Sequence, residues 1–245
     1  MSSSPTLRNP LCKIPRNFPQ FLEEFYPAHR ISTVEAGVQA RVTHASVLLA
    51  WFCGAFASTK VRSFVEAGCG TGFVSFALAR WRGWTGVGID MQPSFAVPFE
   101  QGAQQNGVEQ VVSFVQADVS HLPKAPQIPL ADVLACNPPH FFLQRGRPYG
   151  QEQRRDARSL AEENLPGFVA GLARLLKNRG EFFLVLPAVH GLEWIDALHQ
   201  QRMVPKNMVP VYGRVGKTAR LVLLKGSKNA NRGFVQIEPP VFLRG

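Results

Sequence analysis

The spacing of hydrophobic positions changes along the chain in a regular order, and this order predicts the fold. Short apolar runs of four to seven residues alternate with longer segments in which apolar positions recur every three to four residues. The first pattern is typical of buried strands and the second of amphipathic helices. The predicted strands are Ser63–Ala67, Thr85–Ile89, Val111–Ala117, Val133–Cys136, Glu181–Leu186, Met208–Tyr212 and Leu221–Leu224.

Helical segments separate most of these strands, and two more precede the first strand. Alternation of continuous apolar strands with helices is typical of a parallel sheet covered on both faces, so we expect an α/β fold. Residues 1–19 are rich in Ser, Pro and Asn and predict a loose tail, and Pro98 predicts a break or bend in its helix. The predicted helices are Phe18–Phe25, Arg41–Ala57, Phe73–Trp81, Phe95–Asn106, Leu160–Leu176 and Leu192–Met203.

Length and composition exclude several classes of protein. The 245 residues fit one α/β domain with an extension, or at most two small domains, and at 45% hydrophobic they are too apolar for a disordered chain. The longest dense apolar stretch, Val47–Ala57, is too short to cross a bilayer. The N-terminus lacks a charged-then-apolar leader, and the cysteines form no CxxC pair. We therefore expect a reduced, cytoplasmic enzyme that holds no metal.

The basic residues are distributed unevenly. The formal net charge is +10, yet residues 1–143 carry 10 basic and 9 acidic side chains, whereas residues 144–245 carry 17 and 8. A concentrated excess of this kind favours a polyanionic partner such as nucleic acid over a charge that serves only solubility.

A glycine-rich loop follows the first predicted strand. Gly68, Gly70 and Gly72 lead straight from that strand into a helix, which allows a tight turn and leaves room for a ligand. A dinucleotide-binding loop has the spacing G-x-G-x-x-G, but here the spacing is G-x-G-x-G, with Glu66 two residues before the first glycine. Asp90 closes the second strand, 18 residues beyond Gly72.

The pattern Glu-x-Gly-x-Gly-x-Gly resembles motif I of the class I S-adenosylmethionine (SAM) methyltransferases. The resemblance implies a Rossmann-like, seven-stranded sheet, mostly parallel with an antiparallel closing strand, with helices on both faces. It also implies SAM as the cofactor, S-adenosylhomocysteine as its product, and cofactor-binding roles for the glycines and three acids. Glu66 would serve the amino-acid end, Asp90 the ribose hydroxyls, and Asp118, which closes the third strand, the adenine amino group. Taken alone, Glu66 or Asp118 would be interpreted as a helix cap or turn acid.

The fourth strand ends in Asn137-Pro138-Pro139-His140, for which a strand terminator is the plain interpretation. After the fourth strand of a SAM fold, it resembles the (Asn/Asp)-Pro-Pro-aromatic motif of amino-group methyltransferases. The Asn137 carboxamide oxygen and the Pro138 carbonyl would each accept an N–H of an exocyclic amine and so turn its lone pair toward the methyl group. The resemblance thus assigns Asn137, Pro138, Pro139 and His140 to the catalytic site, and it assigns Asn137 to the cofactor-binding residues as well. His140 stands where the family has Tyr, Phe or Trp to stack on the base, and Phe141 or Phe142 is an alternative for that role.

Outside these motifs, the chain from Val42 onward resembles the bacterial valine-tRNA adenine-N6 methyltransferase family. The resemblance includes Thr43–Ala50, Gly180–Pro187 and Arg220–Leu224, although His44 stands where that family usually has an acid. It implies methylation of adenine N6 in the tRNA anticodon loop. It also divides the chain into a variable N-terminal extension, residues 1–40, and a methyltransferase domain, residues 41–245.

An arginine-rich segment directly after the reacting motif agrees with an RNA substrate. Its cations could hold phosphates on either side of the target nucleotide, although a solvated loop is the simpler alternative. We expect tRNA as the partner, with no membrane and no obligate protein partner. The proposed RNA-binding residues are Arg145, Arg147, Arg154, Arg155 and Arg158.

Other functions remain open from the sequence. The Asn-Pro-Pro motif is shared with guanine-N2 rRNA methyltransferases and with release-factor glutamine methyltransferases. The latter resemble one another in a longer N-terminal helical domain than the roughly 40 residues found here. A catalytically silent RNA-binding module or an NAD-linked oxidoreductase would belong to a different class, and Asn137 together with the spacing of motif I argues against both.

Overall fold

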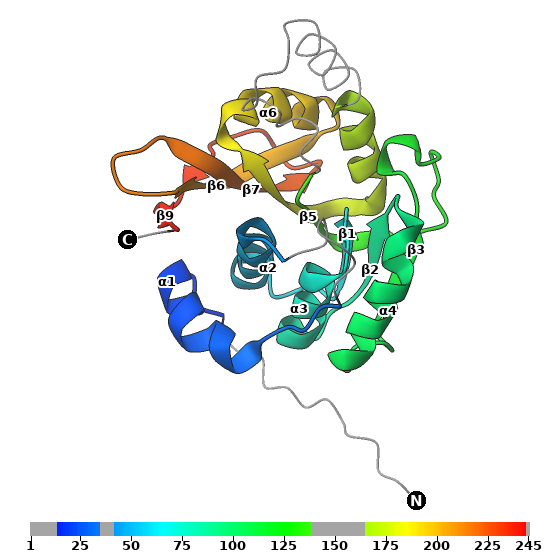
Figure 1. Ribbon diagram of the computed structural model, residues 1–245. Coiled ribbons are helices and arrows are strands. Elements are labelled where there is room, and N and C mark those ends of the chain that lie inside the picture. Colours follow the sequence, from blue (N-terminus) through cyan, green and yellow to red (C-terminus); the bar gives the residue numbers. More distant parts are fainter. Residues whose placement is uncertain (1–13, 35–41, 139–164, 244–245) are drawn as a thin grey trace, which may run out of the picture.

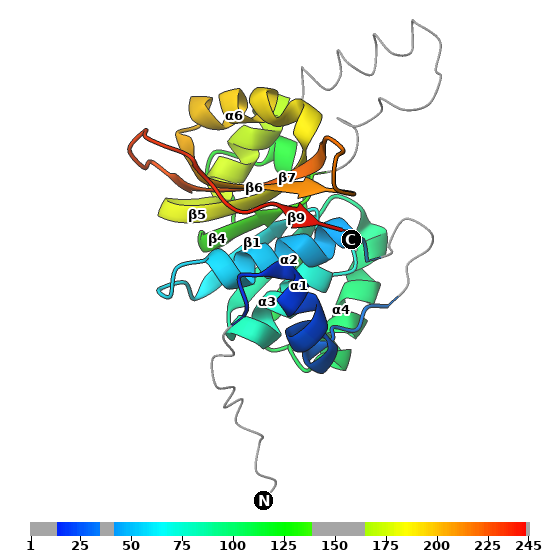
Figure 2. The same ribbon diagram turned by 90° about the vertical axis from the view of Figure 1, so that its left-hand side faces the viewer.

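The computed structural model describes residues 14–34, 42–138 and 165–243 and contains one mixed sheet between two layers of helices (Figures 1 and 2). The strands follow the order β3-β2-β1-β4-β5-β7-β6-β8, and β9 pairs with β6. The strands are β1 Ser63–Ala67, β2 Thr85–Asp90, β3 Val112–Gln116, β4 Ala131–Cys136, β5 Leu176–Pro187, β6 Met203–Tyr212, β7 Ala219–Lys228, β8 Gln236–Ile237 and β9 Val241–Phe242.

The direction of the strands confirms the predicted Rossmann-like class. Strands β1 to β5 pair in parallel, and β7 lies antiparallel between β5 and β6. The chain runs from β1 outward through β2 and β3 and then returns to the other side of β1 with β4. In open α/β sheets, such a reversal of strand order opens a ligand-binding crevice at the carboxyl ends of the strands. The fold therefore places the candidate site between the ends of β1 and β4.

The helices divide between the two faces of the sheet. Helices α2, α3 and α4 lie on one face, and α6 lies with the helix of residues 165–175 on the other (Figure 2). The helices are α1 Phe18–Gln20, α2 His44–Phe56, α3 Phe73–Arg82, α4 Ala96–Gln105 and α6 Gly191–Gln200, with shorter π or 3₁₀ turns η1 Phe21–Phe25, η2 Tyr26–His29, η4 Pro93–Phe95, η5 Val119–His121 and η7 Ala188–His190.

The side chains of the central strands alternate between the two faces. In β4, Val133 and Ala135 join the core beneath α2 and α3, whereas Leu134 and Cys136 join the core beneath α6. Both faces are fully buried, which explains why these strands are continuous apolar runs in the sequence. Among the described residues, no helix has both the length and the apolar character needed to cross a membrane.

Part of the segment predicted as a loose tail is packed against the domain. Ile14 and Phe18 are buried, the indole N–H of Trp51 donates to the carbonyl of Pro15 at 2.8 Å, and the Phe18 and Trp51 rings lie 5.0 Å apart. The prediction was wrong for these residues because it weighed the polar composition of the segment above its few large apolar side chains. The predicted division between residues 40 and 41 stays a prediction, since residues 35–41 lie outside the described part.

Two helix predictions also need correction. Pro98 neither breaks nor bends its helix, because it lies in the first turn of α4, where the missing N–H has no intrahelical acceptor. Helix α6 ends at Gln200, and Met203 already begins β6. Arg202 lies between them with a φ of +55°, a left-handed conformation that ends the helix.

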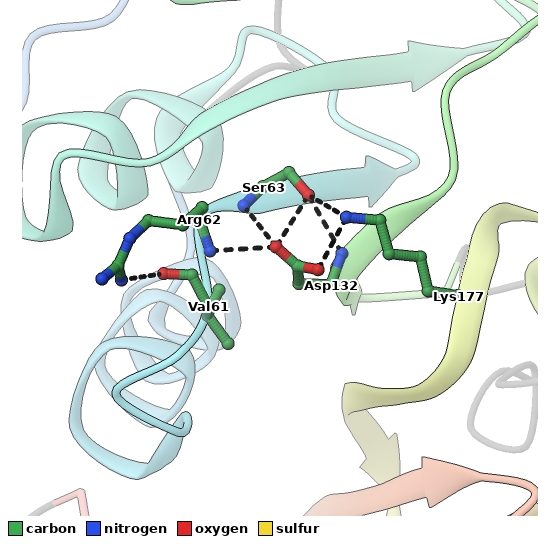
Figure 3. A network of polar contacts seen from close by, with 5 residues as sticks. All are labelled: Val61, Arg62, Ser63, Asp132 and Lys177. Atoms are coloured by element: carbon green, nitrogen blue, oxygen red, sulfur yellow. Dashed lines mark hydrogen bonds and ion pairs between the residues drawn. The ribbon is translucent and has the colours of Figure 1, made fainter.

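A polar network fastens the amino-terminal ends of three strands (Figure 3). Asp132 of β4 accepts hydrogen bonds from the backbone N–H groups of Arg62 and Ser63, both at 3.0 Å, and from Lys177 of β5 at 2.7 Å. Burial pushes the pKa of Asp132 upward, but the Lys177 ammonium and the backbone N–H groups outweigh burial and lower that pKa to about 2. This network holds β1, β4 and β5 in register at the edge opposite the candidate site.

Candidate functional site

The loop after β1 is built on left-handed backbone. Gly68, Gly70 and Gly72 have φ values of +74°, +50° and +87°, which favour glycine over residues with a side chain. A Cβ on Gly72 would lie 2.4 Å from the ring of Phe76, so no side chain fits there. A Cβ on Gly70 would meet nothing within 4 Å. The lack of room at Gly72 explains the tight turn into α3, and the result for Gly70 shows open space above the middle of the loop.

Asp90, at the end of β2, is tied directly to this loop. Its carboxylate accepts hydrogen bonds from the backbone N–H of Gly70 and from that of Gln92, both at 3.0 Å. The backbone N–H of Gly68 donates to the carbonyl of Ile89 at 2.8 Å. The acid predicted to close the second strand and the glycine loop are thus one structural unit. A carboxylate has about four acceptor positions, so Asp90 retains capacity for ligand hydroxyls.

Glu66 is buried beneath the loop and contacts the first turns of α3. Its Oε2 accepts hydrogen bonds from the backbone N–H of Ser75 at 2.8 Å and from the Ser75 hydroxyl at 2.6 Å. Burial raises the pKa of Glu66 to about 8, the hydrogen bonds from Ser75 oppose this shift, and the nearby charge of Asp90 adds to it. At neutral pH, Glu66 is therefore mainly protonated, and a cation beside it would favour the ionised form.

Asp118 lies at the same edge of the sheet but engages its own turn. It caps η5, its side chain accepts from the backbone N–H of Ser120 at 2.8 Å, and it lies 2.7 Å from Nδ1 of His121. Burial raises the pKa of Asp118, but the contacts with His121 and Ser120 outweigh burial and lower it. The backbone N–H of Ala117 donates to the carbonyl of Asp90 at 3.0 Å, so the ends of β2 and β3 are adjacent.

Asn137 begins the loop after β4 and lies beside the glycine loop. Ala67 pairs with Cys136 at the ends of β1 and β4, so Gly68 and Asn137 are the next residues of two neighbouring strands. A Cβ on Gly68 would lie 3.9 Å from the backbone oxygen of Asn137. Pro138 is buried. Pro139, His140, Phe141 and Phe142 lie outside the described residues, as do the five arginines predicted to bind RNA.

Two residues of the site were missed in the sequence. Ser75 holds Glu66 and could have been found only from its position in the first turn of the helix after the glycine loop. Met91 follows Asp90 and is 60% exposed, unusual for a large apolar side chain at the end of a buried strand. The signal for Met91 is its place directly after the acid that closes β2. Within residues 14–34, 42–138 and 165–243, no group of three or more His, Cys, Asp or Glu side chains could hold a metal ion.

Comparison with known proteins identifies the class that this fold and site define. The family model described as "Methyltransferase domain" matches residues 58–209, from the end of α2 into β6. The chain therefore belongs to this methyltransferase family. A search of curated protein sequences finds no match.

Solved structures with the same fold are distant in sequence. A predicted O-methyltransferase from Agrobacterium tumefaciens has a TM-score of 0.61 at 14% identity, covering 81% of this chain and 87% of the other. A protein from Listeria monocytogenes, described as a class I SAM-dependent methyltransferase, has a TM-score of 0.58 at 15% identity. The match covers 83% of this chain and 67% of the other. Magnesium protoporphyrin IX methyltransferase from Synechocystis, solved with bound SAM, has a TM-score of 0.51 at 16% identity. The match covers 75% of this chain and 77% of the other. The fold is therefore that of the methyltransferases, among them proteins described as SAM-dependent.

Proposed function

We propose that the protein transfers a methyl group from SAM to an exocyclic amino group of a nucleobase, with adenine N6 in a tRNA anticodon loop as the target. The observation that carries this proposal is the position of Asn137 against Gly68, at the point where the strand order reverses. Asn137 thus lies at the carboxyl edge of the sheet, where folds of this kind bind their ligands, and we propose that its carboxamide serves there as an acceptor.

The residues around the crevice fit the groups of SAM. Asp90 fits the ribose hydroxyls because it keeps free acceptor positions after binding Gly70 and Gln92. Glu66 fits the cationic amino-acid end, because a cation would stabilise the ionised form of this buried acid. Met91 provides an apolar surface next to Asp90 for the adenine ring. When bound, SAM supplies a methyl group activated by its sulfonium.

The chemistry of an aromatic amine explains why an amide and a proline would meet there. The lone pair of such an amine is delocalised into the ring, so the nitrogen is a weak nucleophile. Acceptors at Asn137 Oδ1 and at the Pro138 carbonyl would bind the two N–H groups, orient the lone pair and stabilise the positive charge that develops on nitrogen. Proline contributes a fixed φ and no competing N–H donor. Orientation of this kind requires no general base with a strongly shifted pKa.

The distribution of charge supports RNA over protein as the polymer. Residues 144–245 carry nine of the ten net positive charges, including the five arginines that follow the reacting motif. Phosphate neutralisation by Lys and Arg is the main source of affinity for nucleic acid. An unpaired anticodon-loop base is also easier to extrude than a paired one.

Transfer of labelled methyl groups tests the proposal. The purified protein is incubated with labelled SAM and, in parallel, with total tRNA, ribosomal RNA and total protein, and the label is followed into each polymer. We expect label in tRNA. Label in ribosomal RNA as N2-methylguanine, or in protein as methylglutamine, would replace the proposed substrate by one of the two other substrates of Asn-Pro-Pro enzymes.

A further inference from the structure

A second pocket lies away from the cofactor crevice. It has a volume of about 660 Å³, within the usual range for sites that bind small molecules. Its walls come from the segment before β4, from the helix of residues 165–175, from the turn between α6 and β6, and from the end of β7. Elements far apart in the sequence therefore converge on one cavity.

The charged side chains that line this pocket are all basic. They come from four separate segments: Lys124, Arg174, Arg202 and Lys228. No acid is among the lining residues, and within the described part of the chain none of the four takes part in an ion pair. Four like charges around one cavity repel each other, and an anion bound between them would relieve that repulsion.

Two of the cations are held in place by backbone carbonyls. Nζ of Lys228 donates to the carbonyls of Ala173 at 2.6 Å and Leu176 at 2.9 Å, at the end of the 165–175 helix. A lysine has three N–H donors, so one remains for a ligand. The guanidinium of Arg174 donates from Nη1 to the carbonyl of Leu122 and keeps its other donors. Both cations are thereby positioned before any ligand arrives.

The other two cations that line the pocket, Lys124 and Arg202, are exposed to solvent. Arg202 has a φ of +55°, where glycine is the usual residue, and the neighbouring Asn229 also has a φ of +55°. The N–H of Asn229 donates to the carbonyl of Arg202 at 2.7 Å. An arginine therefore occupies a position at which glycine would suit the backbone better, so the fold alone does not explain its side chain.

The pocket lies at the edge of the sheet opposite the cofactor crevice. It is lined by Leu130, which precedes β4, by Arg202, which precedes β6, and by Lys228, which ends β7. Because β7 runs antiparallel to β5 and β6, its end lies beside their starts, with Ser227 opposite Glu181 and Lys228 opposite Met203. A ligand in this pocket cannot also reach the reacting loop at the carboxyl edge unless it is a long molecule.

We propose that this pocket binds backbone phosphates of the RNA substrate at a distance from the methylated base. This inference rests on the proposed function, because it takes the substrate to be RNA. Arg and Lys with free N–H donors are the usual ligands of phosphate oxygens, and the apolar part of the lining, which includes Ile128 and Leu130, accommodates sugar carbons. Contacts at both edges of the sheet require a long substrate and explain how a folded RNA would be distinguished from a short oligonucleotide.

A charge-removing double variant of the full chain tests the proposal. Lys124→Gln with Arg202→Gly removes two exposed cations, and glycine suits the left-handed backbone at position 202, so the fold is expected to persist. The matched control is Arg30→Gln with Lys60→Gln, which removes two exposed cations that do not line the pocket. Dissociation constants for unfractionated tRNA are measured between 50 and 300 mM KCl, and calorimetry measures inorganic pyrophosphate binding.

We expect the pocket variant to bind tRNA about 10-fold more weakly than wild type near 0.1 M salt. The slope of log affinity against log salt should fall in magnitude by roughly 1.4–1.8, the value for two lost phosphate contacts. The control variant should bind tRNA like wild type. Equal losses in both variants would overturn the proposal, because bulk charge would then account for binding. Loss of pyrophosphate binding with unchanged tRNA binding would overturn it too, and would assign the pocket to a free phosphorylated ligand.

Methyl transfer measured on the same proteins separates this proposal from the proposed function. Wild-type protein that binds tRNA through the pocket but methylates no RNA would overturn the function and support the pocket. If wild-type protein methylates tRNA and the pocket variant binds tRNA as tightly as the control variant does, the proposed function is supported. The proposal that the pocket binds RNA is then overturned.

Discussion

Asp90 and Gly70 are joined by a hydrogen bond of 3.0 Å from the backbone N–H of Gly70 to Oδ2 of Asp90. The acid that ends β2 therefore fixes the middle of the glycine loop that follows β1, at a glycine where an added Cβ would meet nothing within 4 Å. Removal of this carboxylate is expected to affect both the loop and any ligand over it.

The first prediction concerns cofactor affinity. Asp90→Ala should weaken SAM binding by about 1.5–3 kcal/mol, the range for hydrogen bonds to a charged group, which corresponds to roughly 10- to 150-fold in Kd. Asp90→Asn retains an acceptor for the N–H of Gly70 and should lose less. Calorimetry measures both, with Glu109→Ala, an exposed acid remote from the loop in sequence, as the control. Unchanged SAM affinity in Asp90→Ala, or tight binding of NAD, would contradict the assignment.

The second prediction concerns the pH dependence of stability. The pKa of Glu66 rises from its ordinary value of 4.5 to about 8 on folding, so between these values the folded state holds a proton that the unfolded state has lost. The free energy of unfolding should therefore fall as pH rises through this window, by up to about 1.4 kcal/mol per pH unit, and change no further above pH 8. Glu66→Gln keeps an acceptor for Ser75 and should remove this slope.

Denaturant titrations of wild type and Glu66→Gln at pH 5, 6, 7 and 8 measure the effect. The difference between their unfolding free energies should change steadily with pH. If the free energies of unfolding of the two proteins change with pH in parallel, Glu66 is ionised in the folded state. Other groups would then stabilise its buried charge.

Hydrophobic periodicity was sufficient to predict β1 to β7, but it missed the two short strands β8 and β9 of the described chain and the fine structure of the site. Ser63–Ala67 was predicted as a strand with the bounds that β1 has, because both of its faces are buried and every position from Phe64 to Ala67 avoids solvent. The three strand-end acids were also found, since β1, β2 and β3 are parallel and end at one edge. The hydrogen bond from Ser75 to Glu66 was not predicted, because it depends on how α3 packs against β1.

The basic pocket was likewise beyond the reach of sequence reasoning. Lys124 and Lys228 are 104 positions apart, and only the tertiary fold brings both to the amino-terminal edge of the sheet. Residues near the glycine loop are local in sequence and have a recognisable spacing, whereas cations that converge from four separate elements have none.

The third prediction concerns the network around Asp132. Asp132→Asn should lower the free energy of unfolding at pH 7 by about 1–3 kcal/mol, because two backbone N–H groups and Lys177 lose a charged acceptor. Lys177→Ala should cost less than about 1 kcal/mol, since this side chain is half exposed. The folded pKa of about 2 lies below the ordinary 3.8, so this stabilisation is present above pH 3.8 and lost as pH falls through 2.

Thermal and denaturant unfolding at pH 7, 4 and 2.5 follow this loss, with Asp196→Asn on the exposed surface of α6 as the control. If the free energies of unfolding of wild type and Asp132→Asn differ as much at pH 2.5 as at pH 7, the charge of Asp132 does not explain the stabilisation.

The fourth prediction concerns the arginine-rich segment. Arg154→Glu with Arg155→Glu should weaken tRNA binding steeply and flatten its salt dependence, because each lost phosphate contact releases about 0.7–0.9 fewer counterions. SAM binding should not change. Arg80 and Arg82 make poor controls, since the first donates to the carbonyl of Arg30 and the second lies over the Trp84 ring. Arg30→Glu with Lys60→Glu carries the same change in net charge, and an equal loss in that variant would mean that only bulk charge attracts the RNA.

The measurement that tests the central claim most directly is nucleoside analysis of tRNA after incubation with SAM and either wild-type protein or Asn137→Ala. We predict N6-methyladenosine with the wild type and none with Asn137→Ala. SAM affinity of the variant should stay within about threefold of wild type, because the Asn137 side chain is proposed to bind the target amine. Gln110→Ala, a substitution at an exposed position just before β3, should leave the yield unchanged. Wild-type yield of N6-methyladenosine from Asn137→Ala, or a wild type that methylates another polymer and no adenine, would contradict the account.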